Sequence, residues 1–299
     1  MFAGLYVALV TPFLTDGSVD EAKLRELVRG HIEAGTDGLV PCGSTGESAT
    51  LRSEERQRIL RIVAAEARGK LRVVAGAGTN STAETVENLR ALEGSGVDGA
   101  LVITPYYNKP TQEGLFAHFR AAAQASPVPL VLYNVPSRTG VNLLPATLAR
   151  LAEAEPRIVG IKESSGSLEQ ASQILRLCGD RLTVLCGEDA LTYPSLCIGA
   201  AGVVSVLGNL VPRDMRAMIA AHREGDAAEA RRWHLRLLPL AEALFLETNP
   251  TPVKAAMNLL GMHVGDPRLP LVSPRPETIE KLKRALAEYG LRAPVELGR

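Results

Sequence analysis

The sequence predicts an α/β protein, a TIM (β/α)8 barrel with a C-terminal helical extension. Eight short apolar runs recur at intervals of about 20 to 35 residues, and amphipathic stretches of helical length separate them. Strands that alternate with helices pair in parallel through right-handed crossovers, which leaves a closed barrel and an open doubly wound sheet as options. The count of eight and the length of 299 residues favour the barrel.

The elements can be placed from the N-terminus onward. The predicted strands are residues 5–10, 38–42, 72–75, 99–103, 130–134, 158–162, 182–186 and 202–206. Helices are predicted at residues 21–34, 53–68, 81–92 and 111–124, and the last three begin with Ser or Thr at the expected cap. Ser53 is the expected N-cap of the second helix, without a full capping box because Arg56 stands where a Glu or Gln would be needed.

The remainder of the chain, residues 212–299, contains no further convincing strand. We expect it to be helical and broken into segments by Pro239, Pro250 and Pro252. No Ser/Gly-rich linker or charge run marks a flexible boundary. We therefore divide the chain into a catalytic barrel, residues 1–225, and a C-terminal helical domain, residues 226–299.

The composition argues against several classes of partner. The formal net charge is +0, which leaves no electrostatic footprint for nucleic acid or an anionic membrane. No apolar segment has transmembrane length, and the first residues lack the pattern of a signal peptide. The cysteines form no CxxC pair and suit free thiols in a reducing cytoplasm, where we expect the protein; they are Cys42, Cys178, Cys186 and Cys197.

Lys162 closes the apolar run 157–162, and the polar loop 163–166 follows it directly. Such a run is typical of a buried parallel strand that ends in a loop. A lysine placed there loses hydration, which disfavours its charged form, and a neutral amine can attack a ketone. A strand-end lysine can also extend its ammonium to solvent and take no part in chemistry. The neighbouring loops bear on which interpretation applies.

The loop after the second predicted strand, residues 43–48, has the sequence Gly-Ser-Thr-Gly-Glu-Ser. In a barrel, chemistry takes place on the loops that follow the strand C-termini. Small residues let backbone N–H groups approach an anion, and Ser44 and Thr45 add hydroxyl donors. The loop therefore suits a carboxylate or a phosphate, although a tight glycine turn capped by hydroxyls would use the same residues.

Tyrosines stand at two further strand ends, in a chain that is only 4% aromatic. Tyr106 and Tyr107 follow the fourth strand, and Tyr133 lies at the end of the fifth. A phenol near a lysine and a hydroxyl can relay protons, whereas a purely structural tyrosine would pack in the core with its hydroxyl at the rim. Arg138 offers a planar fork for a substrate carboxylate or, alternatively, a surface ion pair.

Metal and cofactor chemistry find little support. The five histidines fall mainly in helical stretches, and no HxH or HExxH pattern occurs. Residues 76–80 resemble a dinucleotide loop without its third glycine, and neither a P-loop nor a GxSxG motif is present. We expect Glu188 and Asp189 to cap the helix that follows them rather than act as a base. The prediction is no metal and no bound cofactor.

This ordered set of strand-end motifs resembles the pyruvate-dependent class I aldolases, a superfamily that includes the dihydrodipicolinate synthase and N-acetylneuraminate lyase families. The resemblance covers residues 10–12, 43–48, 104–108, 133–140, 160–163, 202–205 and 249–254. Residues 133–140 favour the dihydrodipicolinate synthase family, in which the arginine matching Arg138 holds the carboxylate of aspartate semialdehyde. The resemblance implies a TIM barrel with a C-terminal helical domain that assembles as a homotetramer, a dimer of dimers.

The resemblance also implies a reaction and roles for individual residues. Pyruvate would condense with L-aspartate 4-semialdehyde to give 4-hydroxy-tetrahydrodipicolinate, in lysine and diaminopimelate biosynthesis. Lys162 would form the Schiff base, and Tyr133, Ser44 and Tyr107 would relay protons, with Tyr107 reaching in from a neighbouring subunit across the tight dimer. Ser44 stands where many members carry threonine, and it keeps the hydroxyl. The implied substrate-binding residues are Thr45, Arg138, Gly187 and Val204.

A lysine-binding regulatory site is implied as well. The residues that match it are Ser48, Ala49, Asn80, Glu84 and Tyr106. Ser53 and Arg56 replace histidines that some inhibited enzymes carry there. Because Arg56 would repel a cationic ligand, we expect weak or absent inhibition by lysine.

Two other functions stay open from the sequence. The first is an aldolase that cleaves a 2-keto-3-deoxy sugar acid or N-acetylneuraminate and releases pyruvate, although Arg138 argues against it because a polyhydroxylated tail suits neutral groups. The second is a non-catalytic paralogue that binds a keto acid or serves assembly. The intact set of expected catalytic residues argues against that second function.

Overall fold

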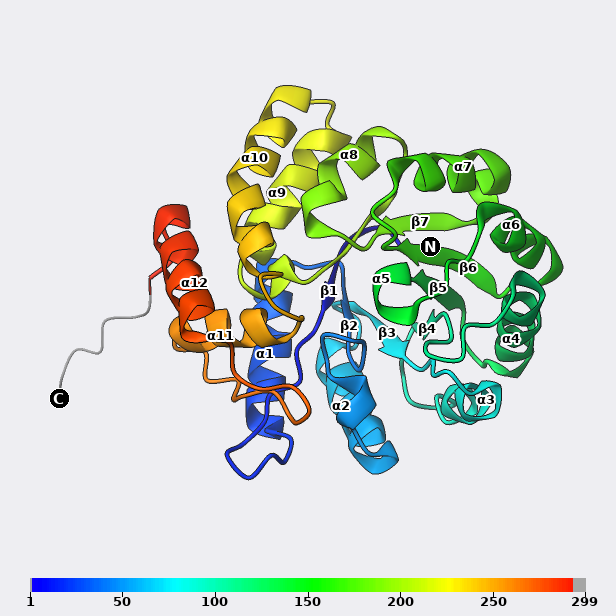
Figure 1. Ribbon diagram of the computed structural model, residues 1–299, viewed down its shortest axis with the longest axis horizontal. Helices are drawn as coiled ribbons and strands as arrows, with labels where there is room; N and C mark the ends of the chain where they lie inside the picture. Colours follow the sequence, from blue (N-terminus) through cyan, green and yellow to red (C-terminus); the bar gives the residue numbers. More distant parts are fainter. Residues whose placement is uncertain (1, 293–299) are drawn as a thin grey trace.

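The computed structural model describes residues 2–292, in which parallel strands close into a barrel wrapped by helices (Figure 1). Each strand pairs with the next, and the last pairs with the first. The strands are β1 (Gly4–Ala8), β2 (Gly38–Val40), β3 (Arg72–Gly76), β4 (Gly99–Ile103), β5 (Leu130–Asn134), β6 (Ile158–Glu163), β7 (Thr183–Cys186) and β8 (Gly202–Ser205). The predicted TIM barrel is confirmed, because closure gives every parallel strand two neighbours.

The first two strands are shorter than the sequence predicts. Beyond Ala8 the chain still donates a hydrogen bond from Leu9 to Val40, but Val10 donates to the Asn209 side chain instead of a strand. Strand β2 ends at Val40 because Cys42 turns into the left-handed region with φ 56°. Apolar residues therefore continue past both strand ends into the loops at the rim of the barrel.

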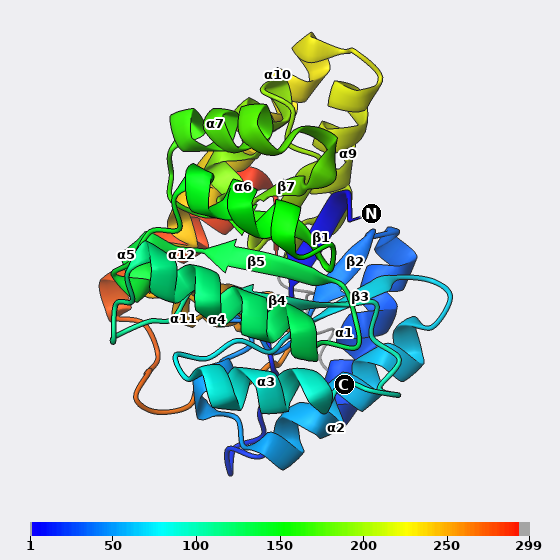
Figure 2. The ribbon, with the colours of Figure 1, turned by 90° about the vertical axis from the view of Figure 1, so that its right-hand side faces the viewer.

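Helices cover the outside of the barrel, and Figure 2 shows α3, α4, α6 and α7 in a row along one side of it. The surrounding helices are α1 (Glu21–Ala34), α2 (Ser53–Ala67), α3 (Thr82–Arg90), α4 (Gln112–Ala125), α6 (Pro145–Ala154), α7 (Leu168–Cys178), α8 (Thr192–Cys197) and α9 (Pro212–Arg223). A short helix, α5 (Pro136–Thr139), follows β5 at the rim. The 3-10 turns are η1 (Ser48–Thr50), η2 (Gly179–Arg181), η3 (Asp189–Leu191) and η4 (Leu207–Asn209).

The expected cap of α2 is wrong. Ser53 is already the first helical residue, and Arg52 occupies the cap position. The Arg52 N–H donates to Glu55 Oε2 over 2.9 Å, so a side chain inside the first turn satisfies the cap. The predicted hydroxyl caps of α3 and α4 are confirmed, since Ser81 and Thr111 accept from the third residue of each helix.

The C-terminal extension is helical, as predicted, and packs beside the barrel (Figure 1). It contains α10 (Ala227–Ala243), α11 (Thr251–Leu259) and α12 (Pro276–Tyr289). The proposed boundary between the barrel and the helical domain, at residues 225 and 226, falls between α9 and α10. Residues 293–299, which we assigned to the helical domain, lie outside the described residues. Pro239 lies inside α10 rather than breaking it, whereas Pro250 and Pro252 stand at the start of α11.

Among residues 2–292, no helix combines the length and the apolar character that crossing a membrane requires.

Candidate functional site

Lys162 lies near the C-terminal end of β6 and is buried, with 6% of its surface exposed. Strand β6 pairs in register with β5, so that Lys162 stands opposite Tyr133. Its Nζ lies 4.3 Å from the centroid of the Tyr133 ring, within reach of a cation–π contact. The sequence placed both residues at strand ends, and the register of the barrel brings them together.

Gly187 completes the surroundings of Lys162. Its N–H donates to Glu163 O at 2.8 Å, which places the glycine beside the end of β6. A Cβ at this position would lie 2.9 Å from Lys162 Cε and would overlap Ser164 Oγ. Any side chain here would displace the Ser164 hydroxyl and crowd the lysine side chain. The Ser164 hydroxyl fills that space and has no hydrogen-bond partner among the described residues.

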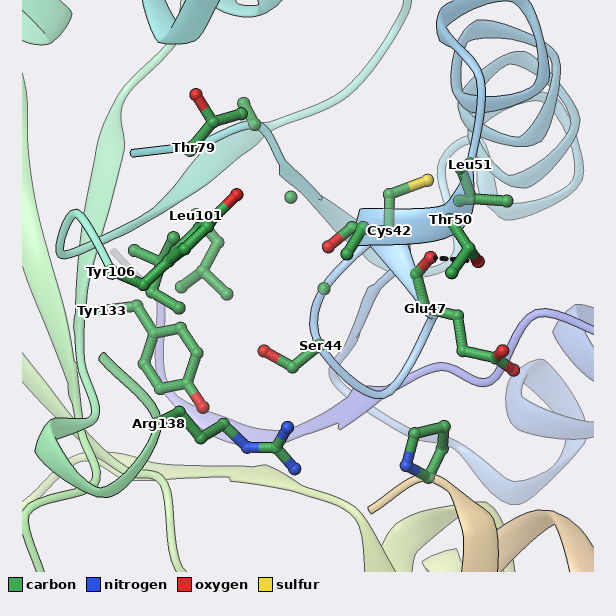
Figure 3. Close-up of a pocket in the computed structure, with 18 of the residues that line it drawn as sticks. Cys42, Ser44, Glu47, Thr50, Leu51, Thr79, Leu101, Tyr106, Tyr133 and Arg138 are labelled. Carbon is green, nitrogen blue, oxygen red and sulfur yellow. Dashed lines mark hydrogen bonds between the residues drawn. The ribbon is translucent and has the colours of Figure 1, made fainter. Parts of the chain in front are cut away.

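A cavity of about 450 Å³ opens at this end of the barrel. Ser44, Tyr133 and Arg138 line it, and Figure 3 shows their polar atoms converging on one space. Lys162, Thr45, Gly187, Val204 and Tyr107 are not among its lining residues. Lys162 meets the cavity through the ring of Tyr133, because the ring lines the cavity and contacts the lysine Nζ.

The loop after β2 is held tightly against the barrel. A Cβ on Gly46 would lie 3.0 Å from Cys42 N and 3.1 Å from Leu9 O, so only glycine fits without a shift. Thr45 is buried, and its Oγ1 accepts a hydrogen bond from Asn249 Nδ2 at 2.9 Å. Ser44 is half-buried and presents its hydroxyl to the cavity (Figure 3). The predicted anion loop therefore faces the cavity as a rigid turn.

Arg138 extends from α5 into the cavity. Its Nη2 donates to Asn249 O at 2.8 Å, and no ion pair involves this arginine within residues 2–292. The alternative of a surface ion pair is therefore not what the structure shows. One guanidinium nitrogen is fixed by the protein, and the rest of the fork stays free for a planar anion.

Asp189 does not cap the helix that follows it, contrary to the prediction. Its Oδ2 accepts from the N–H groups of Val206 at 2.9 Å and Leu207 at 2.8 Å, and its Oδ1 accepts from Ser205 Oγ. The carboxylate therefore anchors the loop after β8, at the start of η4. Burial raises the pKa of Asp189, while these donors oppose that shift.

Glu188 makes no side-chain cap either, and it lies closer to the site than the sequence indicated. Its carboxyl is half-buried with a raised pKa, because of desolvation, and the positive charges of Lys162 and Arg138 act in the opposite direction. Lys162 and Arg138 thus both lie near the Glu188 carboxyl group. No local sequence pattern indicates this, since Arg138 lies in α5, Lys162 in β6 and Glu188 in the loop after β7.

Two predicted site residues lie away from the cavity in the single chain. Tyr107 is 88% exposed, in a left-handed backbone conformation with φ 71°. Val204 is buried within β8, opposite Tyr6 of β1. The roles predicted for them stay predictions.

The residues expected to bind lysine lie close to the same cavity. Ser48, Ala49, Glu84 and Tyr106 line it, whereas Asn80 does not and uses its carbonyl to accept from Asn108 Nδ2 at 2.8 Å. Arg56 lines this cavity and also a groove beside α2, which Ser53 lines too. Arg56 Nε is buried without a hydrogen-bond partner among the described residues.

Sequence reasoning missed one residue that contacts two predicted site residues. Asn249 lines the cavity and bonds both Thr45 and Arg138. It stands in the segment 249–254, which entered the sequence analysis only through the resemblance. Within residues 2–292, no group of three or more His, Cys, Asp or Glu side chains is arranged to hold a metal ion.

A closed barrel with a buried lysine, a tyrosine and anion-binding donors at the strand C-termini defines a lyase of the pyruvate-dependent class I aldolase type. The comparisons agree and identify the particular family. The chain belongs to the dihydrodipicolinate synthetase family, whose model matches residues 1–289. Both the resemblance and the fold that it implied are confirmed.

Individual relatives are similar over almost their full length. The chain is 52% identical over 291 residues to the 4-hydroxy-tetrahydrodipicolinate synthase of Geotalea daltonii, covering 97% of this chain and 100% of the relative. A crystal structure of dihydrodipicolinate synthase from Aquifex aeolicus matches with a TM-score of 0.95 at 43% identity, covering 98% of this chain and 99% of that one. The enzyme from Cyanidioschyzon merolae, crystallised with lysine bound, matches with a TM-score of 0.95 at 44% identity, covering 97% and 99%.

Proposed function

We propose that the chain condenses pyruvate with L-aspartate 4-semialdehyde to give 4-hydroxy-tetrahydrodipicolinate, with Lys162 as the residue that forms the Schiff base. The reaction belongs to lysine and diaminopimelate biosynthesis. The supporting observation is the buried Lys162, whose Nζ lies 4.3 Å from the ring centroid of Tyr133 at the edge of a polar cavity. Relatives that are 50% and 52% identical to this chain are named 4-hydroxy-tetrahydrodipicolinate synthase. These names support the synthase reaction over the sugar-acid aldolase and the non-catalytic paralogue.

The chemistry follows from the amine. The neutral Nζ of Lys162 attacks C2 of pyruvate, and the resulting carbinolamine loses water to give an iminium ion. The iminium accepts the electron pair left when a C3 proton departs, which gives an enamine. The enamine carbon then bonds to the aldehyde carbon of the semialdehyde, whose oxygen takes up a proton. Tyr133, Ser44 and Tyr107 relay these protons.

Two carboxylates have to be held while this happens. The Ser44 and Thr45 hydroxyls bind the carboxylate of pyruvate, and the free part of the Arg138 fork binds that of the semialdehyde. The substrate amine then attacks the iminium carbon, closes the ring and releases Lys162. Gly187 leaves the space that the lysine needs. The substrate-binding role assigned to Val204 rests on the family resemblance, because its side chain is buried in β8.

Assembly and location are part of the proposal. Tyr107 is exposed at a strand end and does not line the cavity of its own chain, which supports its use in the cavity of a second copy. We assign a homo-oligomer, a dimer of dimers, in which the tight dimer shares Tyr107. The cysteines are free thiols, which fits a reducing cytoplasm.

The experiment is an assay of the purified protein with pyruvate, coupled to dihydrodipicolinate reductase and NADPH, with and without aspartate semialdehyde. NADPH oxidation that requires the semialdehyde is the expected result. Pyruvate that is trapped by borohydride without any semialdehyde-dependent oxidation would contradict the choice of aldehyde and keep the lysine chemistry. Release of pyruvate from a 2-keto-3-deoxy sugar acid would then identify the rival reaction.

A further inference from the structure

We infer that Asn249 is a positioning residue that orients the Thr45 hydroxyl toward the carboxylate of pyruvate and fixes the guanidinium of Arg138 beside it. The inference rests on the proposed function, since it assigns these two residues to the two carboxylates. It gives a residue of the C-terminal extension a role in positioning side chains of the barrel loops.

Asn249 stands between α10 and α11 and is buried, with 4% of its surface exposed. Its Nδ2 donates to Thr45 Oγ1 at 2.9 Å, and its main-chain oxygen accepts from Arg138 Nη2 at 2.8 Å. One residue therefore joins the loop after β2 to the helix after β5. Both partners belong to the substrate-binding set, and Asn249 itself lines the cavity.

The direction of the first hydrogen bond decides what Thr45 can do. A threonine hydroxyl has a single proton, and an amide NH₂ group can only donate. Because Oγ1 accepts from Asn249, the hydroxyl proton remains available, and it has no acceptor among the described residues. An incoming carboxylate oxygen is an acceptor for that proton. Asn249 thus leaves Thr45 as a donor at the place where the pyruvate carboxylate is proposed to bind.

The second hydrogen bond constrains Arg138. The side chain is exposed and makes no ion pair within the described part of the chain, so it would otherwise be free to take many rotamers. Its bond to Asn249 O holds one nitrogen and leaves the rest of the fork toward the cavity. This main-chain contact survives substitution of the Asn249 side chain, which separates the two contacts in an experiment.

A buried ion pair also joins the C-terminal extension to the loop that carries Thr45. Lys254, in the first turns of α11, donates from Nζ to Glu47 Oε1 at 2.9 Å, Thr11 O at 3.1 Å and Asp266 O at 3.0 Å. Both side chains of the pair are buried, with exposures of 0% and 1%. Glu47 belongs to the same loop as Thr45 and also accepts from the Arg268 N–H at 2.8 Å, so several contacts besides the Asn249–Thr45 bond join the extension to this loop.

The test is a double-mutant cycle on the full-length protein, with Asn249→Ala, Thr45→Val and the two combined. If Asn249 acts through Thr45, Asn249→Ala raises the KM for pyruvate by roughly tenfold, as the loss of one charge-assisted hydrogen bond would. In the Thr45→Val background the same substitution has little further effect, because residues that act as one unit are non-additive. The KM for aspartate semialdehyde changes less, since the main-chain contact to Arg138 remains.

Two further variants keep the outcome unambiguous. Asn249→Asp conserves the shape but can only accept, so it turns the Thr45 proton away from the cavity and should also raise the KM for pyruvate. Asn258→Ala removes another loop-tying asparagine of the extension, bonded to Gly265 O and Val264 N, and controls for loss of stability. Its KM for pyruvate should stay unchanged.

The outcomes separate this inference from the proposed function. Effects of Asn249→Ala and Thr45→Val that multiply, or an unchanged KM for pyruvate in an active Asn249→Ala enzyme, would overturn the positioning role alone. A wild-type protein that neither turns over nor forms a borohydride adduct with pyruvate would instead overturn the proposed function on which it rests.

Discussion

The Nζ of Lys162 and the ring of Tyr133 lie 4.3 Å apart, on two strands that pair in register. The face of the ring attracts a cation and shields the lysine side chain from water. The phenol of Tyr133 extends from that ring into the cavity, beside Ser44 and Arg138 (Figure 3). The pairing of β5 with β6 therefore fixes the Lys162 amine beside the phenol that we propose as part of the proton relay.

Replacing Lys162 with alanine should abolish the chemistry and leave the fold intact. The side chain is buried and lies against a tyrosine ring, so its loss removes an awkward charge together with some packing. We expect a folded protein by circular dichroism with nearly no turnover. Mass spectrometry after borohydride treatment should show no pyruvate adduct, and a variant as active as the wild type would refute the Schiff-base assignment.

Arg138→Ala should separate the two substrates. Because the guanidinium is proposed to bind only the semialdehyde, pyruvate trapping should persist while the KM for the aldehyde rises by one to two orders of magnitude, on the scale of a lost bidentate contact. Arg150→Ala is a matched control, since Arg150 is an exposed arginine paired with Glu113 on the surface. Loss of trapping in Arg138→Ala alone would show that this arginine acts on pyruvate instead.

The parts of the site that could be predicted from sequence are those with a local pattern. Lys162 and Tyr133 each stand at the end of an apolar run, and parallel strands bring such ends to one rim. The contacts of Asn249 and Asp189 could not be predicted, because their partners Thr45 and Ser205 lie far away along the chain. Contacts between distant segments produce no periodic pattern in the sequence. The α2 cap was misplaced for a smaller reason, since a glutamate within the first turn can replace a hydroxyl cap.

Inhibition by lysine should be weak or absent. Arg56 lines the cavity together with Glu84 and Tyr106, so a cationic ligand there meets a positive charge as well as a carboxylate. Initial rates at increasing lysine should show little inhibition below millimolar concentrations. Arg56→Ala should make the enzyme several-fold more sensitive, and half-inhibition of the wild type at low micromolar lysine would contradict the prediction.

Breaking the Lys254–Glu47 pair should cost substantial stability. Lys254→Met leaves the Glu47 carboxylate buried without its cation, which typically costs about 3–5 kcal/mol. The midpoint of urea unfolding should fall accordingly, and Glu47→Gln in the same chain should restore part of the loss by removing the uncompensated charge. Lys283→Met removes an exposed pair with Glu280 and should have almost no effect. Equal unfolding midpoints for Lys254→Met and Lys283→Met would rule out a stabilising role for the buried pair.

Two buried histidines should make the fold sensitive to mild acid. Burial lowers the pKa of His31 and of His118 to about 4, and each shares a hydrogen bond between Nδ1 and a threonine hydroxyl. The unfolded chain takes up these protons near pH 6.5, whereas the folded protein resists until about pH 4. Stability is therefore fully present above pH 6.5 and falls by about 1.4 kcal/mol per pH unit for each histidine between these limits.

Replacing His118 tests that dependence directly. His118→Gln keeps a polar group near Thr82 and removes one titrating site, so the unfolding free energy should fall less steeply between pH 6.5 and 5 than in the wild type. The exposed His263 supplies the control, since His263→Asn suits its left-handed backbone and should leave the slope unchanged. Parallel pH profiles for the wild type and His118→Gln would show that folding does not lower the pKa of His118.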